Sequence, residues 1–235
     1  MLPDTNIDHS EVSKFNDLAH RWWDSNGDFK PLHDINPIRA DFVERHAGLN
    51  GKRVLDIGCG GGVLSEEMHR RGAKVTGIDA GETVIQVAEL HQAESGTAVE
   101  YRALSAEQLR SEGTEPFDVI TCLELLEHVP DAQALVHTCA ELVRPGGDVF
   151  FSTINRNAKS WLMAILGAEY VLGLLPKGTH DYRKLIRPSE LAAWSRATGL
   201  EVRLIEGMSY NPFSGQAALG KSLDINYIAW LKRPA

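Results

Sequence analysis

The sequence lacks the cysteine pattern of a disulfide-stabilised protein. It contains three cysteines, Cys59, Cys122 and Cys139, with no C-x-x-C pair among them. Secreted domains that depend on disulfides have an even number of cysteines at close spacings. We therefore expect free thiols and a protein that works in a reducing cytosol.

Positive charge is also scarce, because 24 lysine and arginine residues face 32 acidic ones, for a formal net charge of −8. Nucleic-acid binding requires clustered basic side chains, so this balance argues against nucleic acid as a main partner. The first residues, MLPDTNIDHSEVSKF, have neither a basic start nor an apolar core and do not resemble a signal peptide. No apolar run reaches the about 20 residues that span a bilayer. These absences predict a cytoplasmic protein.

Apolar strands alternate with amphipathic helices from about residue 52 onward. Strand patterns occupy 53–57, 74–79, 98–102, 117–122, 148–154, 200–207 and 226–232. Helical patterns occupy 10–23, 37–47, 63–71, 82–94, 132–143 and a segment that begins at Pro188. Such alternation indicates βαβ units and a parallel sheet covered on both faces. The sequence predicts one α/β domain over 1–235 with an open, doubly wound, Rossmann-like sheet. An N-terminal helical extension (1–50), an insertion after the fifth strand (156–187) and a loop at 208–222 complete it.

A glycine-rich loop follows the first strand pattern. The stretch VLDIGCGGG places Gly58 and Gly60 between a strand and a helix, where glycine lets the backbone approach a ligand closely. Asp79 ends the next strand, and a carboxylate there can accept hydrogen bonds from both hydroxyls of a ribose. A dinucleotide fingerprint would need a third glycine where Val63 stands. With Asp56 two residues before its first glycine, the loop instead resembles the first motif of the class I S-adenosylmethionine (SAM) methyltransferases. SAM is therefore the expected cofactor.

Two further stretches resemble the same class of enzymes. FDVITCLELLEHV (117–129) is similar to the fourth strand and the loop after it, and LVRPGGDVFFS (142–152) is similar to the turn before the fifth strand. The acid that often follows the third strand is missing, because the sequence there reads ALSAEQL (103–109). The adenine contacts are therefore left unassigned.

Glu124, Glu127 and His128 follow the fourth strand pattern, at the sheet edge where open α/β folds bind ligands. Their spacing would place the three side chains on one face of a helical turn. A zinc-protease helix is excluded, because a second histidine is missing. Three interpretations stay open: a structural polar turn, a divalent-metal site for a catechol-type substrate, and a general base at His128. Mg²⁺ is the expected ion for the oxygen-rich ligand set of the second interpretation.

The whole chain resembles the ubiquinone biosynthesis O-methyltransferases. The resemblance includes stretches outside the generic cofactor fold, namely FNDLAHRWWD (15–24), FKPLHDINPIR (29–39), STINRNAKSWLMAILGAEYV (152–171), LPKGTHDYRKLIRPSEL (175–191) and YNP (210–212). It implies SAM-dependent methylation of a phenolic hydroxyl in polyprenyl catechol and demethylubiquinol intermediates. Methylation of another small phenol or a carboxylate, or a non-catalytic SAM-binding regulator, are the alternatives.

The resemblance also implies roles for individual residues. The cofactor contacts map onto Arg39, Asp56, Gly58, Gly60, Asp79 and Leu123. Arg39 would bind the SAM carboxylate with its guanidinium fork. Glu124, Glu127 and His128 would coordinate a divalent cation, and His128 and Glu124 are the expected catalytic residues. The adjacent Trp22 and Trp23 suit core or lid packing as well as a pocket wall and are not assigned.

An apolar run, WLMAILGAEYVLGLL at 161–175, follows the predicted parallel strands. Its one charged residue is Glu169, and it is too short to cross a bilayer. Within 156–187 the net charge is +4, against −12 for the rest of the chain. A basic and apolar segment fits contact with anionic lipid, while core or dimer packing would also suit the run. We expect a peripheral protein at the inner face of the membrane that binds a polyprenyl substrate. A complex with other enzymes of the ubiquinone pathway is a further expectation.

Overall fold

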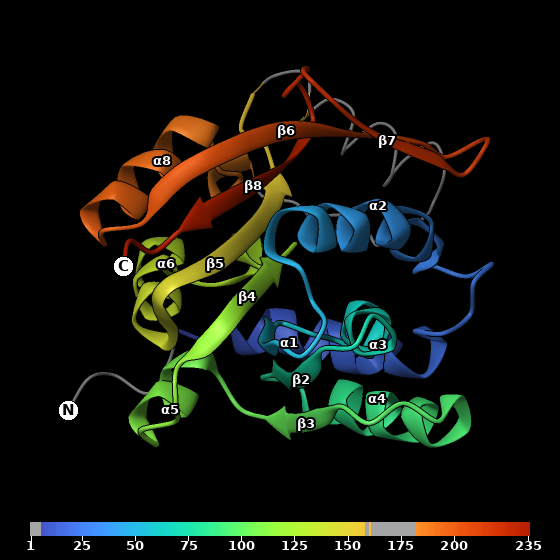
Figure 1. The fold of residues 1–235 in the computed structure, drawn as a ribbon. Helices are drawn as coiled ribbons and strands as arrows, with labels where there is room; N and C mark the ends of the chain where they lie inside the picture. Colours follow the sequence, from blue (N-terminus) through green and yellow to red (C-terminus); the bar gives the residue numbers. More distant parts are fainter. Residues whose placement is uncertain (1–5, 158–159, 161–181) are drawn as a thin grey trace.

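The computed structural model describes residues 6–157, 160 and 182–235, whose strands form an eight-stranded sheet (Figure 1). The order across the sheet is β3-β2-β1-β4-β5-β8-β6-β7. The first five strands pair in parallel, and β8, β6 and β7 join by antiparallel pairing. The strands are β1 (Arg53–Ile57), β2 (Lys74–Asp79), β3 (Glu100–Ala103), β4 (Phe117–Leu123), β5 (Val143–Ile154), β6 (Glu201–Asn211), β7 (Gln216–Gly220) and β8 (Asn226–Lys232). The predicted open α/β sheet is confirmed.

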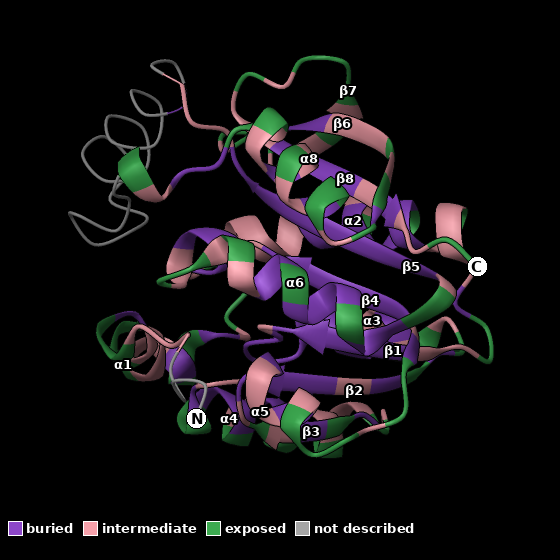
Figure 2. Cartoon of the chain, turned by 90° about the vertical axis from the view of Figure 1, so that its left-hand side faces the viewer, coloured by how far each residue is buried: buried purple, intermediate pink, exposed green. Residues whose placement is uncertain are grey.

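Helices cover both faces of this sheet, so the predicted doubly wound arrangement is also confirmed (Figure 1). Val54 and Leu55 are neighbours on β1 and belong to two separate buried cores, because successive strand residues point to opposite faces. The core around Val54 is closed by α2 (Lys30–Ala47), α3 (Val63–Arg70) and α4 (Glu82–Ser95). The core around Leu55 is closed by α5 (Ala106–Ser111), α6 (Ala132–Leu142) and α8 (Pro188–Ala197). The central strands β1, β4 and β5 are consequently buried (Figure 2).

The N-terminal segment packs onto the helices that follow β1 and β2. It comprises α1 (His9–Leu18) and the short 3-10 helix η1 (Ala19–Arg21). The Trp22 ring stacks on Phe29 with 4.2 Å between centroids, and both rings belong to a buried cluster with Val63 of α3 and Val84 of α4. This cluster places the N-terminal segment against the start of α3, directly after the glycine loop.

The predicted loop at 208–222 is wrong, because this segment contains a β-hairpin. β6 continues to Asn211 and pairs with β7 from Gly207 opposite Gly220 to Asn211 opposite Gln216. Gly215 lies in the turn with a positive φ of 67°, a conformation that suits glycine. The strand β7 reads QAALG and lacks the β-branched and aromatic residues that mark strands, which explains why its sequence pattern is weak. The short α5 has too few residues to show a helical period.

The region after the predicted fifth strand is described only at its two ends. β5 begins at Val143 rather than at 148, so the P-G-G turn lies within the bounds of the strand. At this turn the pairing of β5 with β4 changes register, between Phe117 and Val119 of β4. The apolar run and most of the predicted insertion lie outside the described residues, and the 3-10 helix η4 (Tyr182–Lys184) begins just after them. No helix in the described ranges is long and apolar enough to cross a membrane.

The order of the strands creates a crevice at their carboxyl ends. β1 lies between β2 and β4, so the chain leaves β1 toward one side of the sheet and later returns on the other side. Ligands in open α/β sheets bind at such a switch point. The glycine loop follows β1 and Glu124 follows β4, so these two motifs meet at this crevice.

Candidate active site

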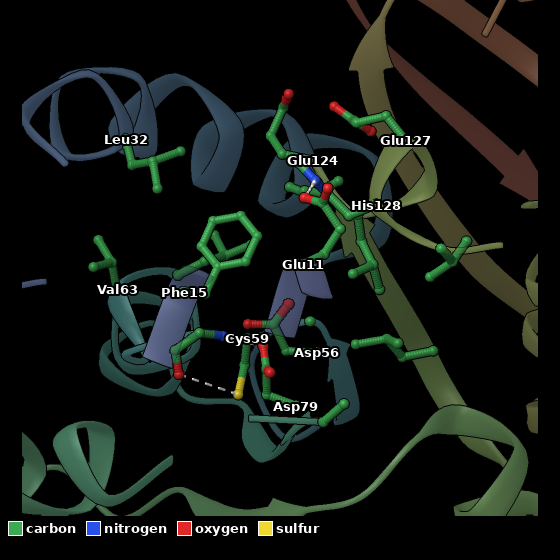
Figure 3. A pocket seen from close by; sticks show the side chains of 18 of the residues that line it. Glu11, Phe15, Leu32, Asp56, Cys59, Val63, Asp79, Glu124, Glu127 and His128 are labelled. Carbon is green, nitrogen blue, oxygen red and sulfur yellow. Dashed lines mark hydrogen bonds and ion pairs between the residues drawn. The ribbon is translucent and has the colours of Figure 1, made fainter. Parts of the chain in front are cut away.

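A cavity of about 480 Å³ lies at the carboxyl ends of the parallel strands (Figure 3). Its volume is in the range of pockets that hold small molecules. Every residue predicted to bind the cofactor or to act on the substrate lines it: Arg39, Asp56, Gly58, Gly60, Asp79, Leu123, Glu124, Glu127 and His128. The structure therefore gathers the predicted site into one cavity.

The glycine loop needs glycine at two of the predicted positions. Gly58 and Gly60 have positive φ values of 72° and 52°, and the amide of Gly58 donates to the carbonyl of Ile78 on β2. A Cβ at Gly60 would lie 2.1 Å from Cζ2 of Trp22, and a Cβ at Gly58 would lie 2.9 Å from Cδ2 of Leu125. The loop backbone is thus in direct contact with side chains from two remote segments.

The unassigned tryptophan pair divides between two environments. Trp22 is buried against the glycine loop and lines the cavity. Trp23 stacks on His91 of α4 with 3.3 Å between centroids, and its indole Nε1 donates to the carbonyl of Gly61 at 2.8 Å. Trp22 is therefore part of the cavity wall, while Trp23 fastens the N-terminal segment to the outside of the loop.

Two aspartates organise the cofactor end of the cavity. Asp79 accepts hydrogen bonds from the amides of Gly60 (3.1 Å) and Gly81 (2.8 Å). Asp56 accepts from the hydroxyls of Ser65 (2.5 Å) and Thr121 (2.7 Å), which fixes the carboxylate at the end of β1. Burial raises the pKa of both aspartates, although these hydrogen bonds oppose the shift. Asp79 lines the cavity and can accept further hydrogen bonds, since each of its carboxylate oxygens has two lone pairs.

Arg39 brings a buried positive charge to the same end. Its side chain lies on α2 and is 5 % exposed, and its Nε has no hydrogen-bond partner among the described residues. Burial lowers the pKa of the guanidinium, while the charges of Glu124 and Asp56 act in the opposite direction. A buried donor without a partner is costly, so an anionic group in the cavity would satisfy it.

Glu124 adopts a strained backbone conformation at the end of β4. Its φ is +54°, a value that non-glycine residues rarely adopt. Ser152 of β5 makes two hydrogen bonds with Glu124. The Ser152 carbonyl accepts from the Glu124 amide (3.0 Å), and the Ser152 hydroxyl donates to Oε1 of Glu124 (2.6 Å). Such strain persists where the surroundings over-determine the conformation, and it is concentrated at functional sites.

Glu127 lies on the short 3-10 helix η2 (Leu126–His128) and is fully enclosed. Its Oε2 accepts a hydrogen bond from the hydroxyl of Thr153 at 2.7 Å. Burial, followed by the nearby charge of Glu124, raises the pKa of Glu127 to about 7. The two glutamates are thus held by successive residues of β5, Ser152 and Thr153.

His128 is held by the N-terminal helix. Its Nδ1 lies 3.0 Å from Oε2 of Glu11, and its ring meets the Phe15 ring edge-on with 5.2 Å between centroids (Figure 3). The pKa of Glu11 is lowered to about 2, and the hydrogen bond with His128 is the largest cause of this shift. Burial alone would lower the pKa of His128, but Glu11 and Glu127 raise it above the ordinary histidine value.

The predicted three-ligand metal site does not fit this geometry. Only Leu126–His128 form a helical turn, and Glu124 lies before it with a left-handed backbone, so the three side chains do not share one helical face. Each side chain is bonded to a different partner, namely Ser152, Thr153 and Glu11. Among the described residues no group of three or more His, Cys, Asp or Glu side chains is arranged to hold a metal ion. We therefore derive no catalytic step through a cation.

Comparison with known proteins now decides the family. A model of the methyltransferase domain matches residues 32–205. A ubiquinone biosynthesis O-methyltransferase of Pseudomonas aeruginosa is 59 % identical over 231 residues, covering 98 % of this chain and 100 % of the relative. The chain belongs to the ubiquinone biosynthesis O-methyltransferases. The relative of the same name in Pseudomonas entomophila is 58 % identical over 95 % of this chain and 97 % of its own. The chain accordingly uses SAM as its methyl donor, as its sequence predicts.

Solved structures show the same fold in other methyltransferases. The magnesium protoporphyrin IX methyltransferase of Synechocystis, solved with bound S-adenosylhomocysteine, has a TM-score of 0.73 at 19 % identity. That similarity covers 96 % of this chain and 100 % of the Synechocystis chain. An N-methyltransferase of Bradyrhizobium japonicum, also with S-adenosylhomocysteine, has a TM-score of 0.64 at 15 % identity over 96 % of this chain and 99 % of its own. At these identities the similarity establishes the fold of the chain, that of the class I methyltransferases.

Several residues that hold the predicted acids and histidine in place have little or no signal in the sequence. The partners of the predicted acids and histidine are Glu11, Phe15, Ser152 and Thr153. Ser152 and Thr153 end a predicted strand, where their position at the sheet edge is a usable but weak signal. Glu11 lies 117 positions before His128 in an ordinary amphipathic helix, and nothing in the local pattern separates it from a solvent-exposed glutamate.

Proposed function

We propose that the protein methylates a phenolic hydroxyl of polyprenyl catechol and demethylubiquinol intermediates. The observation that carries this proposal is a single cavity with two chemically different ends. One end has the glycine loop with Asp56 and Asp79, and the other has Glu124, Glu127 and His128 beside an apolar wall. The wall includes Phe15, Leu32, Ile35, Ile154, Met208 and Pro212. The names of the relatives point to a quinol-type acceptor, and a polyprenyl tail suits apolar surroundings.

The cofactor end provides partners for the carboxylate and the ribose of SAM. We assign the SAM carboxylate to Arg39, whose Nε is buried without a partner among the described residues. We assign the ribose hydroxyls to Asp79. The backbone at Gly58 and Gly60 is assigned the close approach to the cofactor. Asp56 fixes the loop through Ser65 and Thr121, and Leu123 packs at the same end. The whole chain acts as one methyltransferase domain in this assignment.

The acceptor end supplies a base and an orienting acid. SAM supplies an electrophilic methyl group that is transferred by in-line displacement. A phenol with an ordinary pKa of about 10 is protonated at neutral pH, so a base beside it accelerates attack by its oxygen. We assign this base to His128 and assign orientation of the adjacent hydroxyl to Glu124, whose backbone is fixed by Ser152. Holding the oxygen in line with the methyl group contributes further, because correct positioning removes an entropic barrier.

A panel of acceptors with radiolabelled SAM tests the reaction. It contains a prenylated catechol, its demethylubiquinol counterpart, an unprenylated catechol, a mono-phenol and an aromatic carboxylate. We expect turnover of the first two, weaker turnover of the unprenylated catechol and a product methylated on oxygen. Faster turnover of the mono-phenol or the carboxylate would contradict the proposed substrate class, and tight SAM binding without any turnover would identify a regulator. The same assays with EDTA test the cation, and unchanged rates are expected from the geometry.

We further propose peripheral contact with anionic lipid through 156–187, together with a complex with other enzymes of the same pathway. Two basic residues of this segment form ion pairs with acidic residues of the protein itself. Arg156 is paired with Glu190, and Lys184 lies 3.0 Å from Asp8. We therefore expect the apolar run to contribute to the lipid affinity together with the remaining positive charge. In flotation with anionic liposomes we expect binding that survives moderate salt and is lost when 161–175 are replaced by a polar linker. Failure of the parent protein to float would contradict lipid contact.

A further inference from the structure

Glu11 is an acidic residue of the N-terminal helix whose burial the assigned chemistry leaves unexplained. It is 8 % exposed, although glutamate is rarely buried without a partner. Its Oε2 faces His128 Nδ1 at 3.0 Å, inside the cavity that holds the proposed acceptor end. The contact joins α1 to the loop after β4, two segments far apart in the sequence.

The carboxylate of Glu11 is fixed from its other side as well. Oε1 accepts a hydrogen bond from Lys14 at 3.0 Å and lies 3.6 Å from the ammonium of Lys184. The start of α1 is capped by Asp8, whose side chain accepts from the amide of Glu11 and from Lys184. The helix is thus fastened to η4 at the same point where it contacts His128, so Glu11 has little freedom to turn away.

Phe15 completes the contact from the next turn of the helix. Glu11 and Phe15 are four residues apart and share one face of α1. The carboxylate bonds one edge of the imidazole while the Phe15 ring meets it at 86°. The position and the rotation of the His128 ring are therefore both determined by α1 (Figure 3).

This contact also determines which nitrogen of His128 carries the proton. An ionised carboxylate only accepts hydrogen bonds, so Nδ1 must be the donor. In the neutral ring Nε2 then has the free lone pair and can accept a proton. The arrangement has the logic of an acid that orients a histidine base, which recurs on unrelated folds.

We propose that Glu11 is a positioning residue for methyl transfer, which holds His128 with Nε2 ready to take the substrate proton. This inference rests on the proposed role of His128 as the base. As the bond between oxygen and the methyl carbon forms and the bond from sulfur to that carbon breaks, the hydroxyl proton passes to Nε2. The sulfur keeps the electron pair of the broken bond and becomes a neutral thioether. Glu11 itself stays ionised throughout.

The test compares Glu11→Gln, Glu11→Asp and the control Asp17→Asn in the full-length protein. Asp17 lies on the same helix and is exposed, so its substitution removes the same charge without touching the cavity. We expect Glu11→Gln to lower kcat about 10- to 100-fold, less than the about 10²- to 10⁴-fold that a general base contributes because His128 itself is retained, with KM for SAM changed less than about threefold. Glu11→Asp retains a carboxylate and should recover part of the loss, and Asp17→Asn should match the parent.

NMR of the protein with ¹⁵N-labelled histidine adds a readout that loss of packing would not mimic. We expect Nδ1 of His128 to be protonated in the parent and in Glu11→Asp, and the proton to distribute over both nitrogens in Glu11→Gln. If Glu11→Gln does not fold, Glu11→Asp alone decides, with an intermediate kcat supporting the inference and a parent-like kcat with an unprotonated Nδ1 overturning it.

His128→Ala separates this inference from the role of the base. Loss of turnover in His128→Ala together with full kcat in Glu11→Gln would overturn the positioning role and leave the base in place. Full turnover in His128→Ala would overturn the base itself. A double variant no slower than His128→Ala alone is expected, because both substitutions act on one function.

Discussion

The cofactor end and the acceptor end of the cavity are built in different ways. The cofactor end comes mostly from one continuous piece of chain, since Asp56, Gly58, Gly60 and Asp79 lie within 24 residues of each other on β1, its loop and β2. The acceptor end joins a loop after β4, the last residues of β5 and a helix from the start of the chain. A continuous piece leaves a readable motif, whereas an assembled site is defined by contacts that only the fold creates.

The largest effect should come from the continuous end, at Gly60. A side chain there would collide with Trp22 and would require an L-residue at a φ of +52°. We expect Gly60→Val to weaken SAM binding by more than about 100-fold, which corresponds to nearly 3 kcal/mol, as measured by calorimetric titration. Gly96→Ala is the matched control, because Gly96 also has a positive φ but has open space around it. SAM binding by Gly60→Val at parent affinity would show that the loop does not touch the cofactor.

Arg39 tests whether the cofactor end depends on a residue from outside the continuous piece. Lysine keeps the charge but cannot present two parallel donors to a carboxylate. We expect Arg39→Lys to raise the Kd for SAM about 10- to 100-fold while the Kd for a SAM analogue that lacks the carboxylate stays the same. Arg45→Lys, at an exposed position of the same helix, should change neither value. Equal losses for both ligands would contradict the assignment of the carboxylate.

Ser152 tests the assembled end. Its hydroxyl and carbonyl hold Glu124, whose left-handed backbone should relax when the side-chain bond is removed. We expect Ser152→Ala to lower kcat about tenfold with little change in SAM affinity, measured by initial rates and by titration. Ser209→Ala, which removes a hydroxyl bonded to a β7 carbonyl at an exposed position that does not line the cavity, is the control. A loss of SAM affinity equal to the loss of kcat would show that the two ends are not separable.

The sequence predicts the fold and the cofactor end well for a physical reason. Parallel strands are buried on both faces and read as apolar runs, and the glycine loop needs glycine for its backbone conformation at Gly58 and Gly60. The same reasoning places Glu124 and His128 at the correct edge of the sheet, because both lie in the segment that follows β4. It fails at the grouping of the side chains, since the left-handed backbone of Glu124 breaks the predicted helical turn.

The contacts of α1 mark the limit of prediction from one sequence. Glu11 and His128 are separated by 117 positions, and helix periodicity reports which face of α1 is apolar without reporting what that face meets. The hairpin strand β7 is missed for a related reason, because its small residues gain their strand conformation from pairing with β6. Both features depend on tertiary partners and leave little trace in local composition.

The smallest effect concerns stability and follows from the Glu11 and His128 pair. The pKa of Glu11 is lowered to about 2, so its contribution to the stability of the fold is present above the ordinary pKa of glutamate. That contribution is lost as the pH falls from the ordinary value toward 2. His128 has its pKa raised, so its contribution is complete below the ordinary histidine value and is lost as the pH rises through the raised value. The pair therefore stabilises the fold most at mildly acidic pH. In urea unfolding we expect Glu11→Gln to cost about 1–2 kcal/mol near pH 5, with a smaller cost near pH 3 and again near pH 9. A cost that does not vary with pH would show that Glu11 contributes packing alone, and the acceptor end would then be assembled without the charge pair that distinguishes it from the cofactor end.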